Sequence, residues 1–178
     1  MRAQNISKHI TTPRRLRAGF VFLLGLLYAA TLTSCHHMDN KRLPATRVNI
    51  VFWTQAEWIT YGPAGAAGHK DFIRELRRPA DFPYTASTYT GFGGVLLCTD
   101  YSGNPMAYDL ACPVECNAQT RVYINDDLLA ECPKCHSLYD VFALGGGAVG
   151  GPAANNGYGL QVYRVGAGMQ GEYLIVTY

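Results

Sequence analysis

Alternating apolar and polar positions recur from residue 47 to the end of the chain and predict short β-strands joined by turns. The expected strands are residues 47–53, 84–90, 95–99, 106–110, 121–124, 128–131, 160–165 and 172–178. Turn-forming residues at 100–105 and 125–127 separate consecutive strands, so each of these turns predicts a hairpin. The pattern as a whole predicts an all-β domain.

Three stretches interrupt the strand pattern. Residues 71–78 carry their apolar side chains on one side of a helical projection, which predicts one or two helical turns ending before Pro79. The glycine-rich residues 143–152 predict a loop. Residues 62–68 are also glycine-rich, but they lack the Lys and Ser/Thr of a phosphate-binding loop, which argues against a nucleotide site.

Residues 1–34 have the features of a bacterial lipoprotein signal peptide. The apolar run at residues 18–30 follows three arginines, and at about thirteen residues it is shorter than the roughly 20 that span a bilayer. Leu32-Thr33-Ser34-Cys35 resembles the lipobox, which implies cleavage before Cys35 and lipid attachment to its sulfur. We therefore expect a tether at residues 35–45 and a domain at residues 46–178, anchored to a membrane on the extracytoplasmic side of the cell envelope.

The composition fits one turn-rich β domain. Removal of the leader leaves about 144 residues, enough for a single core. Five of the fifteen Lys and Arg residues lie in the leader, which leaves ten against thirteen acidic residues. A nearly neutral balance of this kind provides no basic surface for nucleic acid, so we expect no nucleic-acid partner. The nineteen glycines, twelve tyrosines and nine prolines favour strands and turns.

Four cysteines lie in two turns that each follow the end of an expected strand. Cys112 and Cys116 form a C-x-x-x-C turn, and Cys132 and Cys135 form a C-x-x-C turn. Thiolates at this spacing suit Zn(II) or iron, with zinc–sulfur distances of about 2.3 Å. In an oxidising compartment the same cysteines can instead form disulfides, and the sequence does not assign their pairing. Cys98 lies in an apolar run and is expected to be a buried thiol that packs as a small hydrophobe.

The order of these motifs resembles the Rieske iron-sulfur domain over about seventy residues, 97–165. The segments that carry the resemblance are AYDLACP, a hairpin, ECPKCHSLYDVF, a loop with Gly151-Pro152-Ala153, and GLQVYRV. The resemblance implies an antiparallel β domain whose smaller metal-binding part, about residues 105–155, presents two loops at hairpin tips. It places Cys112 and Cys132 where the family has its two cysteine ligands.

The sequence departs from the family at the histidine ligands. Val114 stands at the first histidine position and Cys135 at the second, and Val114 has no metal-binding atom. His136 lies one residue out of register, because Tyr139-Asp140 fixes the spacing of the second loop. The two histidines on one iron raise the potential of Rieske centres, so the resemblance does not imply an ordinary Rieske cluster here.

Three functions remain open from the sequence. In the first, Cys112, Cys116, Cys132 and Cys135 hold a [2Fe-2S] cluster for electron transfer to an unknown redox partner, or a zinc ion that stabilises the module. In the second, the fold is metal-free, and disulfides tie the loops of a binding or scaffold lipoprotein. In the third, Cys132 and Cys135 act as a thiol oxidoreductase, for which a strand-to-strand setting lacks the usual helix N-terminus.

We prefer the metal-bound alternative, because four thiols in two facing loops are more than the fold requires. The smaller metal-binding part is also too short to bury much apolar surface without a cross-link. No hydrolytic motif is present, and we expect no enzymatic activity from this chain alone. Glu115 and Glu131, each beside a cysteine, are expected to be solvent-facing carboxylates.

Overall fold

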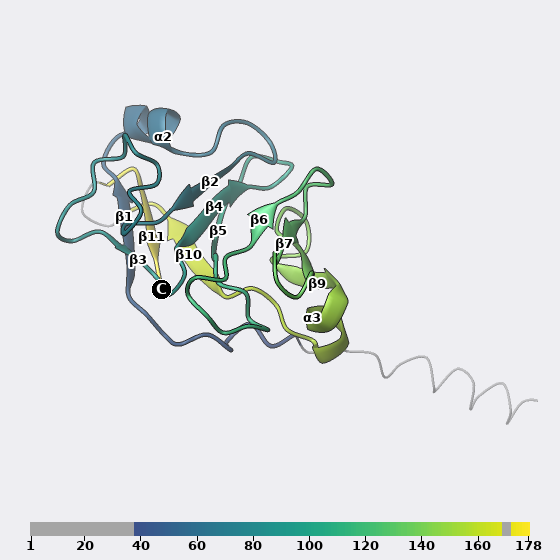
Figure 1. The fold of residues 1–178 in the computed structure, drawn as a ribbon. Coiled ribbons are helices and arrows are strands. Elements are labelled where there is room, and N and C mark those ends of the chain that lie inside the picture. Colours follow the sequence, from purple (N-terminus) through teal and green to yellow (C-terminus); the bar gives the residue numbers. More distant parts are fainter. Residues whose placement is uncertain (1–37, 169–171) are drawn as a thin grey trace, which may run out of the picture. The chain divides into compact units, whose positions relative to one another are not determined.

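The structure, a computed structural model, describes residues 38–168 and 172–178. This part of the chain is mostly antiparallel β and contains two short helices (Figure 1). The all-β class expected from the sequence is thereby confirmed. None of the helices in the described residues is long and apolar enough to cross a membrane. The signal peptide and the lipidated Cys35 expected from the sequence lie outside the described residues.

Seven strands form the larger sheet, which is nearly closed. In spatial order they are β2 (His69–Phe72), β4 (Val95–Thr99), β5 (Pro105–Asp109), β10 (Val162–Gly166), β11 (Leu174–Thr177), β1 (Val48–Phe52) and β3 (Tyr89–Thr90). The two edge strands meet where the backbone N–H of Arg74, just after β2, donates to the Thr90 hydroxyl of β3 at 3.4 Å. Helix α2 (Gln55–Tyr61) follows β1 and is capped by Thr54, whose hydroxyl accepts from the Glu57 N–H.

Four short strands form a second sheet, which is inserted in sequence between β5 and β10. Their spatial order is β6 (Tyr123–Ile124), β7 (Ala130–Glu131), β8 (Leu138–Asp140) and β9 (Gly147–Gly150), and helix α3 (Gly151–Asn156) follows β9 directly. The hairpins expected at residues 95–110 and 121–131 are both present, as β4–β5 and β6–β7. The loops that carry the cysteines leave β5 and β7.

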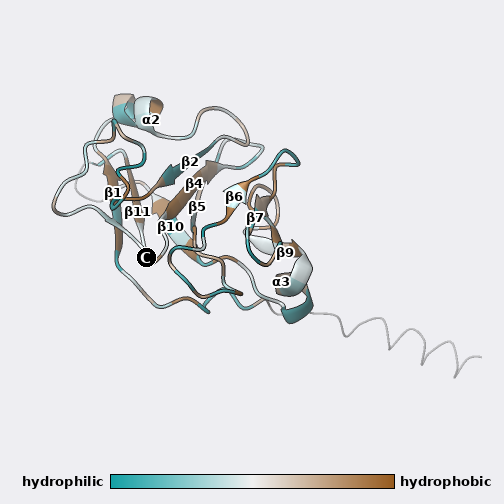
Figure 2. Ribbon diagram, in the orientation of Figure 1, coloured by the Kyte–Doolittle hydropathy of each residue, from teal (hydrophilic) through white to brown (hydrophobic). Residues whose placement is uncertain are grey.

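Strand β4 is buried on both faces and separates two hydrophobic cores. Val95 and Leu97 face the interior of the larger sheet, where they join Phe52. Leu96 and Cys98 face the opposite way and pack with the side chains of the smaller sheet. All five residues of β4 are therefore buried, and the strand is among the most hydrophobic in Figure 2. Packing of this kind joins the two sheets into one compact unit, to which the described residues belong.

Two buried polar side chains of β5 fix the strand just before Cys112. The Tyr108 hydroxyl donates to the backbone carbonyl of Val141 at 3.1 Å and so ties β5 to the smaller sheet. Asp109 is fully buried, and its carboxylate accepts the Tyr163 hydroxyl at 2.5 Å. The carboxylate also accepts from three backbone N–H groups, those of Phe92, Gly93 and Ala111. These bonds satisfy a buried carboxylate and hold the backbone that leads into the first cysteine loop.

The helical turns expected at residues 71–78 are wrong. Residues 69–72 pair with β4 as β2, and the backbone groups of Ile73 and Arg78 then exchange two hydrogen bonds across a tight turn. A helix of eight residues is marginal in water, so pairing with the buried β4 decides the structure of this segment. The strand expected at residues 84–90 is shorter than predicted, because only β3 pairs with β1.

Two segments expected to be irregular are ordered by contacts. The glycine-rich residues 143–152 include β9 and the start of α3. The first described residues of the expected tether pack on the domain: the Asp39 N–H donates to the Gly157 carbonyl at 2.7 Å, and Leu43 is buried. These backbone contacts are made between segments far apart in sequence, which local patterns do not reveal.

Candidate metal centre

The two cysteine loops have the same backbone turn. Each begins with Cys-Pro, and the N–H of its fifth residue donates to the carbonyl of the first cysteine, from Cys116 to Cys112 at 2.9 Å and from His136 to Cys132 at 3.0 Å. The fifth residue of each turn has a positive φ, 47° at Cys116 and 55° at His136. The repeated turn presents Cys112 and Cys132 from the ends of two different strands, β5 and β7.

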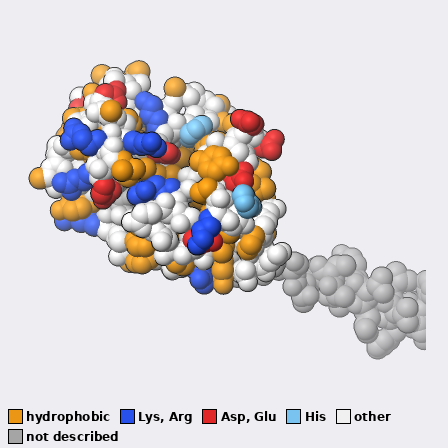
Figure 3. Space-filling model, in the orientation of Figure 1, with side chains coloured by type: hydrophobic (Ala, Val, Ile, Leu, Met, Phe, Trp, Pro, Cys, Tyr) orange, Lys and Arg blue, Asp and Glu red, His pale blue; other side chains and the backbone are white. Residues whose placement is uncertain are grey.

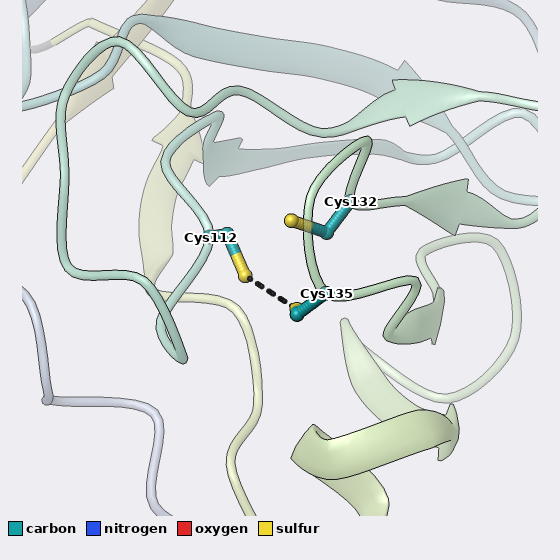
Figure 4. Close-up of side chains that lie close together, drawn as sticks. All are labelled: Cys112, Cys132 and Cys135. Carbon is teal, nitrogen blue, oxygen red and sulfur yellow. Dashed lines mark hydrogen bonds between the residues drawn. The ribbon is translucent and has the colours of Figure 1, made fainter.

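Three thiols converge between the two loops. The sulfurs of Cys112, Cys132 and Cys135 all lie within 4.8 Å of one another, and those of Cys112 and Cys135 are 3.6 Å apart. Figure 4 shows the three side chains directed toward a common point between the loops. Cys112 and Cys132 are fully buried, and Cys135 is partly buried. Three soft donors at these separations could hold one metal ion.

Two hydroxyl groups contact the sulfurs from the second loop and β8. The hydroxyl of the fully buried Tyr139 lies 3.5 Å from the Cys112 sulfur. The Cys135 sulfur lies 3.1 Å from the Ser137 hydroxyl, which in turn accepts the Ala153 N–H of α3 at 3.0 Å. Hydrogen bonds to thiolates stabilise the charged form, so these hydroxyls orient the sulfurs and support the state that binds a metal.

The surroundings move the cysteine pKa values in opposite directions. Burial raises the pKa of Cys112 to about 12, so without a positive charge nearby this sulfur stays a thiol. Burial also acts to raise the pKa of Cys135, but hydrogen bonds from Ser137 and the neighbouring thiols of Cys132 and Cys112 lower it overall. Burial and the adjacent Cys112 raise the pKa of Tyr139, which keeps its hydroxyl a donor. A bound cation would favour the thiolate form of all three cysteines.

Cys116 is not part of this group. Its side chain is exposed, and its thiol donates to the Pro113 carbonyl at 3.1 Å. The Arg42 guanidinium lies 3.8 Å from the Cys116 sulfur and also donates to the Pro113 carbonyl at 3.0 Å. Within residues 38–168 and 172–178, Cys112, Cys132 and Cys135 cluster as potential metal ligands without Cys116. The structure thus brings together three of the four cysteines expected to form the site.

The charged residues beside the cysteines pair with each other. Glu115 was expected to face solvent, but its side chain is only 14% exposed and it pairs with Lys134 of the second loop. The contact therefore links the two loops. Glu131 pairs with His136 at 3.2 Å. The imidazole of His136 is 74% exposed, and His136 is not among the clustered ligands of the described residues.

Cys98, Val114 and the Cys132–Cys135 pair are the other positions considered in the sequence. Cys98 is fully buried in β4, and burial, helped by the Asp100 charge, raises its pKa to about 12. Val114 packs against the core of the smaller sheet and supplies no ligand atom. Cys132 and Cys135 lie between β7 and β8, so no helix begins at this pair to lower a catalytic thiol pKa.

Sequence reasoning missed four side chains around the site: Arg42, Lys134, Ser137 and Tyr139 were not recognised as contacts of the cysteine loops. Ser137 and Tyr139 carry hydroxyls two and four residues after Cys135, and this spacing was a usable signal, because alternate residues of a strand face the same side. Arg42 and Lys134 make contacts across loops, for which the sequence contains no local signal.

Comparison of the chain with models of known protein families, with curated proteins and with solved structures found no match.

Proposed function

We propose that the chain is a lipid-anchored protein of the bacterial cell envelope whose Rieske-like domain holds one metal ion through Cys112, Cys132 and Cys135. The lipid on Cys35 would attach it to the membrane. The Rieske-like part of the proposal is supported by the sequence motifs and by two loops that present cysteines from the ends of β5 and β7. The metal would stabilise the smaller sheet, and the chain would not act as an enzyme by itself.

The convergence of three sulfurs carries the proposal. Two sulfurs bound to one tetrahedral zinc at about 2.3 Å lie about 3.8 Å apart. The Cys112 and Cys135 sulfurs are 3.6 Å apart, and all three sulfurs lie within 4.8 Å, so a zinc ion needs little movement of the loops. A three-thiolate zinc site has a fourth position, which a solvent molecule can fill.

A single ion fits this ligand set better than an iron-sulfur cluster. A [2Fe-2S] cluster takes four protein ligands, two on each iron. Only three cysteines converge among the described residues, and Cys116 is held by Pro113 and Arg42 instead. We therefore favour zinc as the resident ion and a structural role over electron transfer.

The smaller sheet is the part of the fold that a metal would help most. Its strands are two to four residues long. The first cysteine loop connects this sheet to β5 of the larger sheet, and the second lies between β7 and β8. Short strands bury little apolar surface, so small folds of this kind gain stability from cross-links such as metal ions. A metal held by both loops would cross-link β5 to β7.

The distance between the Cys112 and Cys135 sulfurs favours a second function, in which a disulfide replaces the metal. The Cys112 and Cys135 sulfurs are close enough for a small rotation to form a disulfide between the loops, with the loss of two electrons and two protons to an oxidant. In an oxidising compartment this bond would tie the loops without a metal, and the protein would then be a metal-free binding or scaffold lipoprotein.

The test is the metal content of the chain from residue 36 onward, purified without oxygen. We expect about one zinc per chain and free thiols. Cys132→Ser should lose the metal, because Cys132 belongs to the group of converging cysteines. Cys116→Ser makes the same chemical change outside that group and should keep the metal. Two irons with visible absorption would instead indicate a cluster. A metal-free protein with Cys112 and Cys135 joined in a disulfide would establish the second function.

A further inference from the structure

A pocket of about 350 Å³ lies on the outer face of β1. The alternation of this strand places Ile50 and Phe52 in the core, while Asn49, Val51 and Trp53 line the pocket. Its volume falls in the range of small-molecule sites, about 300–1,000 Å³. No lining residue belongs to the cysteine group, so the pocket is separate from the candidate metal centre.

Trp53 places an exposed aromatic ring at the edge of the pocket. Its side chain is 58% exposed, although an indole is usually buried for most of its surface. The backbone beside it is fixed, because the Trp53 N–H donates to the Glu57 carboxylate at 2.6 Å and Thr54 caps α2. An exposed aromatic ring at the edge of a pocket can stack on a flat apolar surface of a ligand.

Polar groups surround the ring with both donors and acceptors. Oε2 of Glu57 accepts from the backbone of Trp53, and Oε1 is a second acceptor on the same carboxylate. The Asn49 amide donates to the Ser87 carbonyl at 2.8 Å, and its oxygen remains an acceptor. The hydroxyls of Thr85 and Ser87 are 2.9 Å apart and can each donate or accept. The pocket therefore matches a ligand rich in hydroxyl groups.

The charge of the lining excludes anionic ligands. Lys and Arg side chains gather mainly over the larger sheet on the face drawn in Figure 3, but none lines this pocket, where Glu57 is the one charged residue. A phosphate or carboxylate ligand would lie beside the negative charge of Glu57, with no Arg or Lys side chain in the lining to pair with it. We propose that this pocket binds a neutral saccharide, whose apolar ring face stacks on Trp53 while its hydroxyls bond to Glu57 and Asn49.

The outer face continues beyond the pocket onto β11. Val51 is paired with Ile175, and Asn49 with Thr177, so these side chains of adjacent strands lie side by side on the same face. None of the four is charged. A second sugar ring can rest there, and an oligosaccharide is therefore expected to bind more tightly than a single sugar.

The test is calorimetric titration of the full-length protein in detergent micelles with maltotetraose, cellotetraose and chitotetraose. We expect at least one of these neutral oligosaccharides to bind with a Kd of about 1 mM or below, and its monosaccharide to bind more weakly. Trp53→Ala should weaken binding by about tenfold or more. Glu57→Gln keeps the hydrogen bond to the Trp53 backbone and should weaken binding less.

Tyr101→Ala is the matched control, because Tyr101 is 59% exposed, as Trp53 is, but does not line the pocket. This variant should bind the sugar as the unaltered protein does. The proposal is overturned if none of the three oligosaccharides binds at about 10 mM. It is equally overturned if Trp53→Ala leaves the affinity unchanged, or if tetramethylammonium occupies the pocket and displaces the sugar, which would make it a cation site.

Discussion

Replacing Tyr139 by Phe removes one hydroxyl from the candidate metal centre and leaves the packing of the ring in place. That hydroxyl lies 3.5 Å from the Cys112 sulfur, and the side chain is fully buried. A hydrogen bond to a charged acceptor contributes about 1.5–3 kcal/mol, and sulfur is a weak acceptor, so we assign about 1–1.5 kcal/mol to this one. Because 1.4 kcal/mol corresponds to a factor of ten, Tyr139→Phe should raise the Kd for zinc about five- to twelvefold.

The affinity is measured by competition between the protein and a chromogenic zinc chelator, under reducing conditions. Tyr108→Phe is the matched control, because Tyr108 is buried in the same hydrophobic core and its hydroxyl donates to the Val141 carbonyl instead of a cysteine. That variant should lower the free energy of unfolding by about 1–2 kcal/mol, since a buried carbonyl loses its donor, and leave the zinc affinity unchanged.

Two results would contradict this reasoning. If Tyr139→Phe binds zinc as tightly as the unaltered protein does, the hydroxyl does not stabilise a metal-bound Cys112. If Tyr108→Phe weakens zinc binding as much as Tyr139→Phe, the effect comes from loosening of the shared core and not from the contact with the sulfur.

Two further predictions follow from buried groups outside the metal centre. Asp109→Asn should lower the free energy of unfolding by about 2–4 kcal/mol in urea denaturation, because an amide nitrogen would replace a carboxylate oxygen among several N–H donors. Tyr163→Phe, which removes a single bond to that carboxylate, should cost about 1.5 kcal/mol, and equal losses in the two variants would contradict the assignment. Iodoacetamide at about pH 8 should modify Cys116 before Cys98, because Cys116 is exposed, whereas Cys98 is buried and its burial raises its pKa to about 12. Mass spectrometry of peptides from the folded protein gives the order, and early modification of Cys98 would refute it.

The hairpins were predictable because their signals are local. The β4–β5 hairpin combines an apolar run with a turn at residues 100–105, where the Asp100 carboxylate accepts the N–H groups of Ser102 and Asn104. Residues 71–78 show the opposite case. Their amphipathic pattern is real, but the partner that decides their structure, β4, lies more than twenty residues further along the chain.

The candidate site was predictable in part because the spacing of its cysteines is also a local signal. Cysteines at the ends of expected strands pointed to two facing loops, and the loops do bring Cys112, Cys132 and Cys135 together. The exclusion of Cys116 follows from the turn itself, in which a fifth residue with positive φ directs its side chain to Pro113. Cysteine spacing gave no indication of this backbone conformation.

The ligands of the zinc ion are counted most directly by X-ray absorption spectroscopy of the zinc-loaded protein at the zinc edge. We expect three sulfur neighbours at about 2.3 Å and one oxygen or nitrogen neighbour at about 2.0 Å, with the sulfur count unchanged in Cys116→Ser. Four sulfur neighbours that fall to three in Cys116→Ser would contradict this expectation, because Cys116 would then be a ligand.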